Sequence, residues 1–386
     1  MNYYNNQFFR NEYVNLFGGG IEKKWNTLKH NGLLFPDEYI QKFIPIIVND
    51  KKIILNKEAE EYAFIYTKYL DSEYIKNKNF NKNFWNDWKV LLNNDLIKNL
   101  ESCNFSLIKN DIIKKKEKDK LDKKNNIDNE KISLYKYATV DGVVVKVSNF
   151  KIEPPGIFIG RGNHPKLGMI KKRIYPEDIT INIGKNELVP SLPHGHHWKN
   201  IIYDNTIEWI ASWKDLISGK TKYVWLADKS KNDIKKYDIA RKLGKKIHKI
   251  RKQIHIDVKN DKDIKIKQLA TCIYLIDLLA LRIGNEKKED EADTVGVSSL
   301  RVEHIKLLEN NIIRLKFLSK DSIEYNNEIK IDHYVWNNLD EFIKDKNKDD
   351  NIFEYVSTAE INEYLKSLMN NLTAKVFRTY NASHLF

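Results

Sequence analysis

The chain has 386 residues, of which 41% are hydrophobic and 31% charged, a balance typical of folded rather than disordered proteins. Since this length exceeds what one hydrophobic core usually supports, two or three domains are expected. The sequence contains no run of 18 apolar residues and no basic-then-apolar leader after Met1, so neither a membrane span nor a secretory signal is predicted. Cys103 and Cys272 belong to no CxxC pattern, which disfavours a disulfide framework and a zinc knuckle.

The charge balance is strongly basic. There are 66 Lys and Arg residues against 53 Asp and Glu residues, a formal net charge of +13. Such an excess favours a polyanionic partner, because cationic side chains attract phosphates and release counterions on binding. A Lys- and Asn-rich codon bias is the alternative source of part of this charge. No P-loop motif occurs in the sequence, which argues against an NTP-driven motor.

The first third of the chain predicts helices after an N-terminal extension, residues 1–18, that leads into a glycine turn. Apolar residues recur at helical spacing in 56–72 and again in 80–100, as in helices that bury one face. Residues 109–136 are almost continuously charged, which predicts a long exposed helix. Its charge indicates either a solvated face or a positively charged lever over a nucleic acid.

The rest of the chain changes from strands to helices. Short β-branched runs separated by Gly, Pro and Asn fill 142–225, so this region is expected to be β-rich. A basic helix over 229–256 and a second helix over 263–281 follow. A hairpin-like pair at 312–325 then precedes further helices. The predicted class is α+β.

A glycine-rich basic segment, 149–173, has the composition of a phosphate-backbone contact. Gly160 and Gly162 flank Arg161 and allow the main chain to approach a ligand closely. The same pattern occurs in ordinary hairpins, so both interpretations stay open. The basic residues of this segment, and so the candidate contacts to a nucleic-acid backbone, are Arg161, Lys166, Lys171, Lys172 and Arg173.

Three cationic residues from separate predicted elements could converge. Arg282 ends an apolar helix, Lys320 lies in the turn of the predicted hairpin, and Arg378 lies near the C-terminus. A lone arginine at a helix end often only caps carbonyl groups. Together, two guanidinium groups and one ammonium group would form a site for a phosphate.

Five motifs carry a resemblance to a known family. In order along the chain they are IEPPGIFIGRGNHPKLGM, LALRIGNEK, EADTVGVSSLRVEHI, FLSKDSIEY and LTAKVFRTYNAS. These motifs resemble those of the eukaryotic type IB DNA topoisomerases, and the likeness runs from about Gly19 to Ser383. Five long motifs in register are far more specific than a short pattern.

The resemblance implies transient cleavage of one strand of duplex DNA through a 3′-phosphotyrosyl bond, without ATP or another cofactor, in the nucleus. Arg282 and Arg378 would stabilise the charge that develops on the scissile phosphate. Lys320 would give its proton to the departing 5′ oxygen. The implied fold is a two-lobed DNA clamp. A mixed β/α cap lobe over 19–228 carries long projecting helices within about 56–136, and a mainly α-helical catalytic lobe spans 229–386.

The resemblance also implies DNA contacts outside the basic segment. Two opposing lips are implied at 163–166 and 289–293, where Lys166 could pair with Glu291. The further residues implied to contact DNA are Asn163, His164, Asn285, Lys287, Thr294 and Asp321.

The sequence departs from the family near its C-terminus. The family's nucleophilic tyrosine and a downstream histidine have no counterpart among these residues, so we expect a truncated core that is inactive alone. Tyr380 is no substitute, because two helical residues turn it about 200° from Arg378. The alternatives are a non-catalytic DNA-binding clamp and one half of a split enzyme completed by a separate tyrosine-bearing chain. The histidines of 193–198 resemble a family stretch with no metal role, so no metal is expected.

Overall fold

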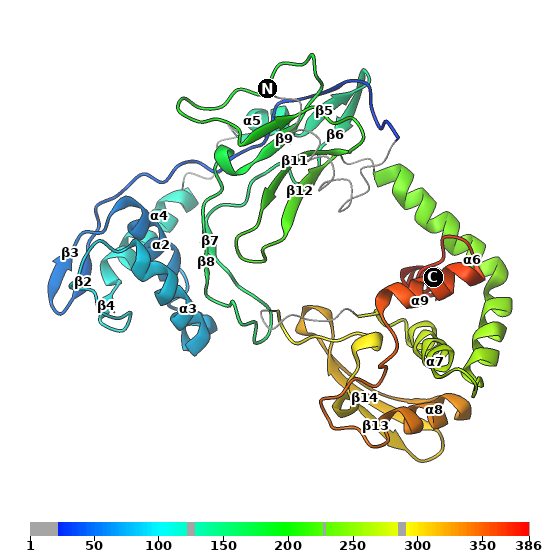
Figure 1. The fold of residues 1–386 in the computed structure, drawn as a ribbon. Helices are drawn as coiled ribbons and strands as arrows, with labels where there is room; N and C mark the ends of the chain where they lie inside the picture. Colours follow the sequence, from blue (N-terminus) through cyan, green and yellow to red (C-terminus); the bar gives the residue numbers. More distant parts are fainter. Residues whose placement is uncertain (1–21, 122–127, 227–228, 285–290, 386) are drawn as a thin grey trace, which may run out of the picture. The chain divides into compact units, whose positions relative to one another are not determined.

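The computed structural model describes residues 22–121, 128–226, 229–284 and 291–385. The chain mixes helices and strands (Figure 1) and divides into two compact units. Unit 1 comprises Met1–Ile159 with Lys166–Asp228, and unit 2 comprises Gly160–Pro165 with Lys229–Phe386. No helix among the described residues is both long and apolar enough to cross a membrane.

One part of unit 1 is helical and is held by an aromatic core. Helices α2 (Lys57–Thr67), α3 (Lys78–Trp88) and α4 (Ser106–Leu121) lie beside a sheet in the order β3-β2-β4 (Figure 1). The ring of Tyr66 stacks on Phe84 with centroids 4.2 Å apart. The strands of this sheet are β2 (Ile46–Val48), β3 (Lys51–Ile53) and β4 (Cys103–Asn104).

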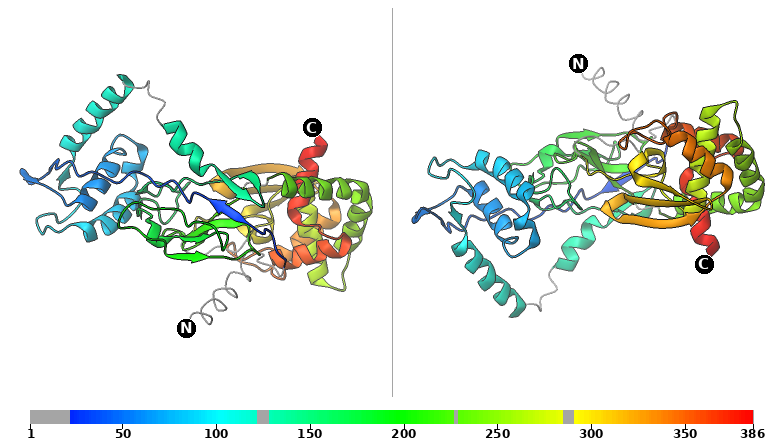
Figure 2. Two further views of the ribbon diagram at one scale, coloured as in Figure 1. Left: turned by 90° about the horizontal axis from the view of Figure 1, so that it is seen from above. Right: turned by 90° about the horizontal axis from the view of Figure 1, so that it is seen from below.

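Two helical predictions in this part need correction. The helix expected over 80–100 ends at Trp88, followed by one 3-10 turn, and Leu92 is already extended. The single long helix expected over 109–136 is described as α4 and α5 (Asp128–Tyr135), with residues 122–127 between them outside the description. In Figure 2, α4 runs out from the helical part and α5 leads back to the strands of unit 1.

The other part of unit 1 is built from small sheets. One has the order β1-β5-β6, and a four-stranded sheet has the order β10-β9-β11-β12, in which only β9 and β10 are parallel. Strands β7 and β8 form a separate antiparallel pair. The strands are β1 (Leu28–His30), β5 (Tyr137–Val140), β6 (Val143–Lys146), β7 (Gly156–Ile157), β8 (Ile170–Lys171), β9 (Thr180–Asn182), β10 (Asn200–Ile202), β11 (Trp209–Lys214) and β12 (Thr221–Trp225).

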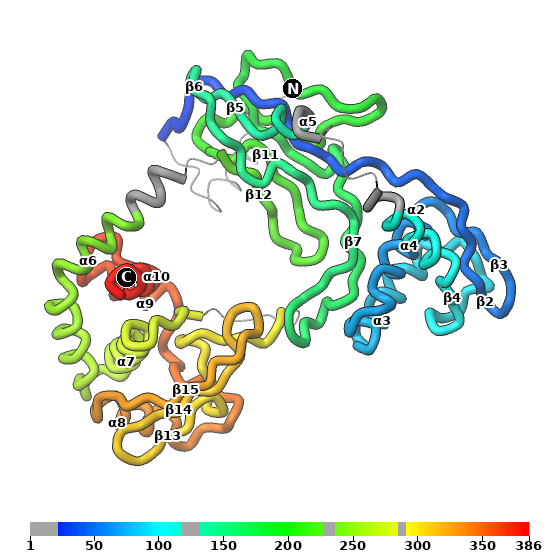
Figure 3. The backbone as a smooth tube through the Cα atoms, turned by 180° about the vertical axis from the view of Figure 1, so that it is seen from behind, coloured from blue at the N-terminus to red at the C-terminus, as the bar shows by residue number. Residues whose placement is uncertain are grey.

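The described part of unit 2 contains helices α6 to α10 and one antiparallel sheet, and residues of both contribute to one buried core. Helix α6 contacts both α7 and α10 (Figure 3), and the apolar face of α7 is buried in the core. The predicted hairpin is present, but a third strand that the sequence analysis missed, β13, completes the sheet. The elements are α6 (Lys229–Val258), α7 (Ile264–Leu279), β13 (Ile305–Leu308), β14 (Ile312–Leu318), β15 (Glu324–Lys330), α8 (His333–Ile343), α9 (Thr358–Leu368) and α10 (Ala374–Leu385).

Gly168 tests the packing of β8 against α3. Its φ is +93°, and an added Cβ would lie 2.1 Å from the carbonyl oxygen of Phe80. Gly142 also has a positive φ, +80°, but has no atom within 4 Å of an added Cβ. We predict that Gly168→Ala lowers the free energy of unfolding by roughly 3 kcal/mol or more, and Gly142→Ala by about 1 kcal/mol. Thermal unfolding checks this, and equal losses would contradict it.

His30 makes the stability of unit 1 depend on pH. Its Nε2 lies 2.9 Å from the carbonyl oxygen of Asn182, and its Nδ1 accepts a hydrogen bond from the Gly32 amide. Burial lowers the pKa of His30, so the unfolded chain takes up the proton first as pH falls. We predict that stability falls below about pH 6.5, by at most ~1.4 kcal/mol per pH unit. Denaturant unfolding of His30→Gln should lose this component, and an unchanged pH slope would contradict the assignment.

Candidate active site

A cavity of about 390 Å³ in unit 2 brings together residues from four separate segments of the chain. Arg282, Lys320 and Arg378 all line it, as does Thr294. The remaining lining residues are Ile283, Gly284, Val295, Gly296, Ala374 and Lys375. No carboxylate is among the described residues that line this cavity, so its polar character is cationic.

Arg282 reaches the cavity because α7 ends abruptly. Ala280 adopts the left-handed conformation, with φ +50°, and caps the helix. In the segment that follows, the carbonyl oxygen of Arg282 accepts a hydrogen bond of 2.9 Å from the amide of Val297. Arg282 therefore lies just beyond the end of α7, in a segment that is hydrogen-bonded to Val297.

The segment Thr294–Ser298 connects the two sides of the cavity. At one end the amide of Val295 donates to the carbonyl oxygen of Leu318, the last residue of β14, at 2.8 Å. At the other end the amide of Ser298 donates to Ile283 at 2.7 Å. Main-chain bonds thus hold the strand that leads to Lys320 and the segment that carries Arg282 at a fixed spacing.

Lys320 lies in the five-residue turn between β14 and β15. The amide of Ser319 donates to the carbonyl oxygen of Ile323 at 2.8 Å and closes the turn. Asp321 and Ser322 follow with φ values of +69° and +56°. Two successive left-handed residues other than glycine are costly, so this turn depends on its surroundings to keep its shape.

Arg378 is oriented by its own helix and by α7. Its Nε donates to the carbonyl oxygen of Ala280 at 2.8 Å, which leaves the rest of the guanidinium group for the cavity. Burial, and after it the charge of Arg282, lowers the pKa of Arg378, although the group stays protonated. The two guanidinium groups therefore repel each other across the cavity, and an anion between them would relieve this repulsion.

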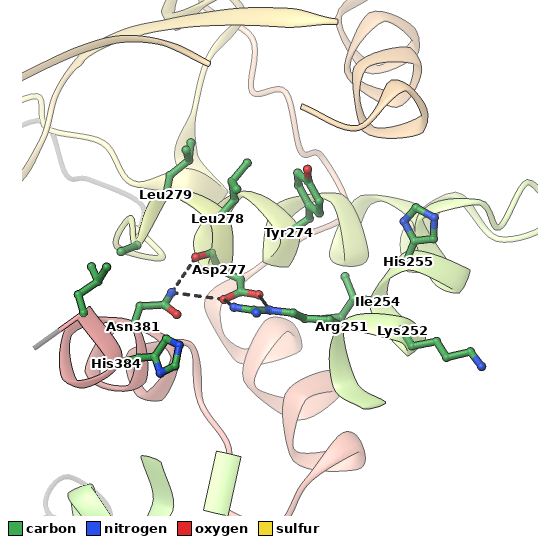
Figure 4. A pocket seen from close by; sticks show the side chains of 12 residues that line it. Arg251, Lys252, Ile254, His255, Tyr274, Asp277, Leu278, Leu279, Asn381 and His384 are labelled. Carbon is green, nitrogen blue, oxygen red and sulfur yellow. Dashed lines mark hydrogen bonds and ion pairs between the residues drawn. The ribbon is translucent and has the colours of Figure 1, made fainter. Parts of the chain in front are cut away.

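One turn further along α10, a polar cluster fastens this helix to α7 (Figure 4). The side-chain amide of Asn381 donates to the main-chain oxygen of Asp277 at 2.7 Å. The carboxylate of Asp277 also accepts Nε of Arg251 at 2.7 Å and a second guanidinium nitrogen at 3.1 Å. This cluster holds the helix that carries Arg378, and it is separate from the cationic cavity lined by Arg282, Lys320 and Arg378.

Lys375 is a cavity residue that the sequence analysis missed. It lines the cavity beside Arg378 and precedes it by three residues on α10, so both project from the same face. The helical spacing of Lys375 and Arg378 within one motif was the available signal.

The glycine-rich segment places Arg161 on the Lys320 turn. Nη1 of Arg161 lies 3.0 Å from a carboxylate oxygen of Asp321, and the hydroxyl of Ser322 donates to the Arg161 carbonyl oxygen at 3.3 Å. An added Cβ at Gly162 would lie 2.6 Å from that hydroxyl. The turn therefore packs against residues 160–165, where only glycine fits at position 162.

The other basic candidates differ in how far they are free to meet DNA. Lys172 is exposed, as is Asn163, whereas His164 is half-buried. Lys171 pairs with Glu153 at 2.5 Å, and Lys166 donates to the carbonyl oxygen of Ile217 at 2.7 Å.

Arg173 is fixed inside unit 1. Its side chain is 11% exposed, pairs with Glu61 at 2.7 Å, and donates to the main chain of Pro36 and Asp37. These bonds give Arg173 a structural role, and we leave it out of the proposed DNA contacts.

Some sequence predictions fall where the structure gives no detail. Asn285, Lys287 and residues 289–290 of the second lip lie outside the described residues. In the histidine-rich stretch, Nδ1 of His196 lies 3.1 Å from Glu177. No cluster of three or more His, Cys, Asp or Glu side chains suited to a metal ion occurs in the described part of the chain.

Tyr380 and Arg378 line different cavities. Tyr380 packs beside Gly244 of α6 and stacks on His384, with centroids 5.5 Å apart. Its ring therefore faces away from the cationic cavity.

The cavity has the properties of a site that binds a phosphate and stabilises negative charge on it. Comparison with known proteins agrees with this class. Residues 23–226 match the family described as "Eukaryotic DNA topoisomerase I, DNA binding fragment", and residues 226–386 match "Eukaryotic DNA topoisomerase I, catalytic core". The chain belongs to the eukaryotic DNA topoisomerase I family.

Individual relatives support the same assignment. The chain is 44% identical to DNA topoisomerase 1 beta of Arabidopsis thaliana over 378 residues, which cover 95% of this chain and 41% of the relative. It is 43% identical to DNA topoisomerase 1 of Caenorhabditis elegans, with 93% and 48% covered. It is also 43% identical to that of Homo sapiens, with 93% and 50% covered. The chain thus spans half or less of the length of these relatives.

Gly296 tests how the cavity is held together. Its backbone is in an ordinary conformation, but an added Cβ would lie 2.4 Å from the Gly284 main chain and 2.7 Å from the Arg282 oxygen. We predict that Gly296→Ala separates the two segments and lowers the free energy of unfolding by roughly 2–3 kcal/mol. Hydrogen exchange of the Val297 amide and thermal unfolding measure this.

Gly244→Ala is the matched control in the same unit. It lies inside α6, where an added Cβ meets only the Tyr380 ring, at 3.1 Å. Alanine is favoured over glycine inside a helix by about 1 kcal/mol, so little stability should be lost. A larger loss for Gly244→Ala than for Gly296→Ala would contradict the proposed role of the glycine contact.

Proposed function

We propose that this chain binds duplex DNA and supplies the phosphate-activating part of a type IB topoisomerase reaction, the ATP-independent relaxation of supercoiled DNA. The observation that carries the proposal is the single cavity lined by Arg282, Lys320 and Arg378. Two guanidinium groups can donate several hydrogen bonds to a phosphodiester, and an ammonium group can lose a proton where a guanidinium group cannot. This division of roles fits strand cleavage by transesterification.

In the proposed cleavage step a tyrosine hydroxyl loses its proton to solvent, its oxygen forms a bond to the scissile phosphorus, and the bond from phosphorus to the 5′ oxygen breaks. Arg282 and Arg378 stabilise the charge on the non-bridging oxygens, and Lys320 donates its proton to the departing 5′ oxygen. The reverse step returns the proton to Lys320 and reseals the strand. We propose that Lys375 adds a further phosphate contact, since it lines the same cavity. None of these roles needs ATP or another cofactor.

The attacking tyrosine is the part that these 386 residues do not supply in our proposal. Tyr380 lines another cavity, so we assign it a structural role. The nucleophile then comes from a tyrosine-bearing segment beyond residues 1–386, with a separate chain as the possible source. Units 1 and 2 would act as the cap and catalytic lobes of a DNA clamp, in the nucleus.

Contacts to DNA are proposed from the glycine-rich segment and from residues near the cationic cavity. Arg161 faces Asp321 beside the Lys320 turn, which suits a contact close to the cleaved phosphate. Thr294 lines the cavity with its side chain largely buried. The remaining proposed contacts are Asn163, His164, Lys166, Lys171, Lys172, Asn285 and Lys287. A non-catalytic DNA clamp is the alternative, favoured by the same cationic surface without the tyrosine.

We predict that the chain alone binds duplex DNA but does not relax supercoiled plasmid, and that an added tyrosine-bearing C-terminal domain of a relative restores relaxation without ATP. With that domain present, Arg378→Ala should slow single-turnover cleavage by about 10²–10³-fold and Lys320→Ala by about 10²-fold or more. Gel assays of plasmid topology and of covalent complex measure these effects.

Lys316→Ala is the control for Lys320→Ala. Lys316 lies on β14 four residues earlier, is well exposed and pairs with Glu324. Its removal should leave cleavage nearly unchanged. Relaxation by the unassisted chain would refute the missing-nucleophile proposal, while DNA binding without any restored cleavage would favour the non-catalytic clamp. DNA affinity should also fall steeply with salt.

A further inference from the structure

The antiparallel sheet of unit 2 has an open edge. Its outermost strand, β15, pairs with β14 over all seven residues of Glu324–Lys330, and β13 lies on the far side of β14 (Figure 3). Outside this pairing, no described residue forms a hydrogen bond with the main chain of β15. An open row of main-chain donors and acceptors is a surface to which another extended strand can add.

The outward-pointing main-chain groups of β15 belong to its even-numbered residues. Before the strand, the amide of Ser319 donates to the carbonyl oxygen of Ile323 at 2.8 Å. After the strand, the amide of Ile331 donates to Asn311 at 2.9 Å. Because hydrogen-bonded positions alternate along an antiparallel pair, both bonds place the odd-numbered residues against β14 and the others outward. The outward-pointing residues, all of them exposed, are Glu324, Asn326, Glu328 and Lys330.

The order of side chains along this edge is complementary to itself. When a second copy of β15 lies antiparallel about a two-fold axis at Asn327, Glu324 faces Lys330 of the second copy. Asn326 then faces Glu328 of the second copy, and each contact occurs twice because of the symmetry. A carboxylate opposite an ammonium group, and an amide opposite a carboxylate, are favourable cross-strand pairs. In this register the outward-pointing residues of the two copies also meet, so their main-chain groups can form the bonds of an antiparallel ladder.

Neighbouring registers of the same pairing are unfavourable. The smallest shift that keeps the outward-pointing groups opposite one another is two residues, because these groups alternate along the strand. In one direction this shift places Glu324 opposite Glu328 of the second copy, and in the other it places Glu328 opposite the same residue of the second copy. Like charges directly opposite each other destabilise a strand pair. The charge pattern of β15 therefore favours one register over its neighbours.

The bonds that the edge side chains already make leave the required groups available. Nε of Arg314 donates to Oδ1 of Asn326 at 3.2 Å, so the side-chain nitrogen of Asn326 can still donate. Nζ of Lys316 lies 3.5 Å from Glu324, whose side chain is 54% exposed, and a carboxylate can accept more than one donor. Lys330 has no ion-pair partner in the described part of the chain. The self-complementary pairs can therefore form without breaking contacts within the sheet.

The inner face of β15 contributes an apolar pair in the same register. Tyr325 and Ile329 are half-buried beside the core of unit 2. With the axis at Asn327, Tyr325 of one copy faces Ile329 of the other. An aromatic residue opposite a β-branched residue stabilises a strand pair, and this contact would cover apolar surface that a single copy leaves partly exposed.

We propose that two copies of this chain associate through β15, with the two strands antiparallel about Asn327, so that their sheets form one continuous sheet. The partner assigned to this edge is thus a second copy of the chain. The inference goes beyond the proposed function, because β15 contributes no residue to the cationic cavity. A two-fold interface of this kind closes on itself, so association stops at the dimer.

Sedimentation of the full chain without DNA measures this association. The wild-type chain should show an equilibrium between monomer and dimer. Glu324→Lys should weaken the dimer about tenfold, because an attractive pair becomes repulsive at two places. Lys330→Glu should have an effect of similar size. The double variant Glu324→Lys/Lys330→Glu should recover most of the affinity, since the two charges only exchange strands.

Lys306→Glu is the matched control for Lys330→Glu. It makes the same substitution on β13, the strand at the opposite edge of the same sheet, where Lys306 is exposed. This variant should associate like the wild-type chain.

Asn326→Pro tests the main chain of the edge. The proline ring removes an outward-pointing N–H and leaves the hydrogen bonds to β14 intact, as in natural edge strands that contain proline. This variant should stay folded, which thermal unfolding verifies, and should no longer form the dimer.

The outcomes decide between this interface and none. A wild-type chain that stays monomeric up to roughly 100 μM, where even a contact of micromolar affinity forms, would overturn the proposal. A dimer that tolerates Asn326→Pro would also overturn it, because another surface would then hold the copies together. Equal weakening by Lys306→Glu and Lys330→Glu would attribute the effect to net charge and would contradict the register. Weakening by each single variant with recovery in the double variant would support the register about Asn327.

Discussion

The short segment Thr294–Ser298 is the constraint on which the site depends. Its main chain bonds to Leu318 at the base of the Lys320 turn and to Arg282 and Ile283 on the other side. Cationic groups that face one cavity repel each other, so they stay together only if the framework that carries them resists the repulsion. Main-chain hydrogen bonds and the close contact of Gly284 with Gly296 provide that resistance. In the proposed reaction, a site fixed in advance in this way would stabilise charge without having to reorganise.

The net charge of +13 is therefore a poor guide to which cations meet a ligand. Arg173 forms an ion pair with Glu61 and donates hydrogen bonds to two carbonyl groups. Arg301 forms a bidentate ion pair with Asp293. Lys267 is nearly buried and bonded to Asp261 and Glu341. By contrast, the Arg378 side chain forms one hydrogen bond to the described residues, from its Nε to the carbonyl oxygen of Ala280. The positions of the acidic residues therefore decide which cationic side chains are paired within the fold and which face a cavity.

Helix α10 connects the two cavities of unit 2. Its N-terminal half carries Lys375 and Arg378, which line the cationic cavity. Its C-terminal half carries Asn381, His384 and Leu385, which line the second cavity of unit 2, of about 870 Å³. The bonds from Arg378 to Ala280 and from Asn381 to Asp277 fix this helix to α7 at both places.

The sequence by itself determined the elements whose signal is local. The apolar period predicted the helices that became α6 and α7, and the β-branched runs predicted the strand-rich part of unit 1. The motifs also identified Arg282, Lys320 and Arg378 as a set, since each residue lies within a long specific pattern. The sequence did not predict the third strand β13 or the early end of α3, because both depend on neighbours that lie outside a short stretch of sequence.

Only the tertiary structure decided which cations share a cavity and which are neutralised. Arg173 and Glu61 are 112 residues apart, so no local pattern could show that this arginine is buried in an ion pair. Lys375 was recognised as a cavity residue only from the structure, which shows which face of α10 lines the cavity. The second cavity of unit 2 likewise depends on the packing of α6, α7 and α10, where Asp277 accepts hydrogen bonds from Arg251 and Asn381. Spacing along a chain specifies which residues share a face, whereas burial and charge pairing depend on what the fold brings opposite that face.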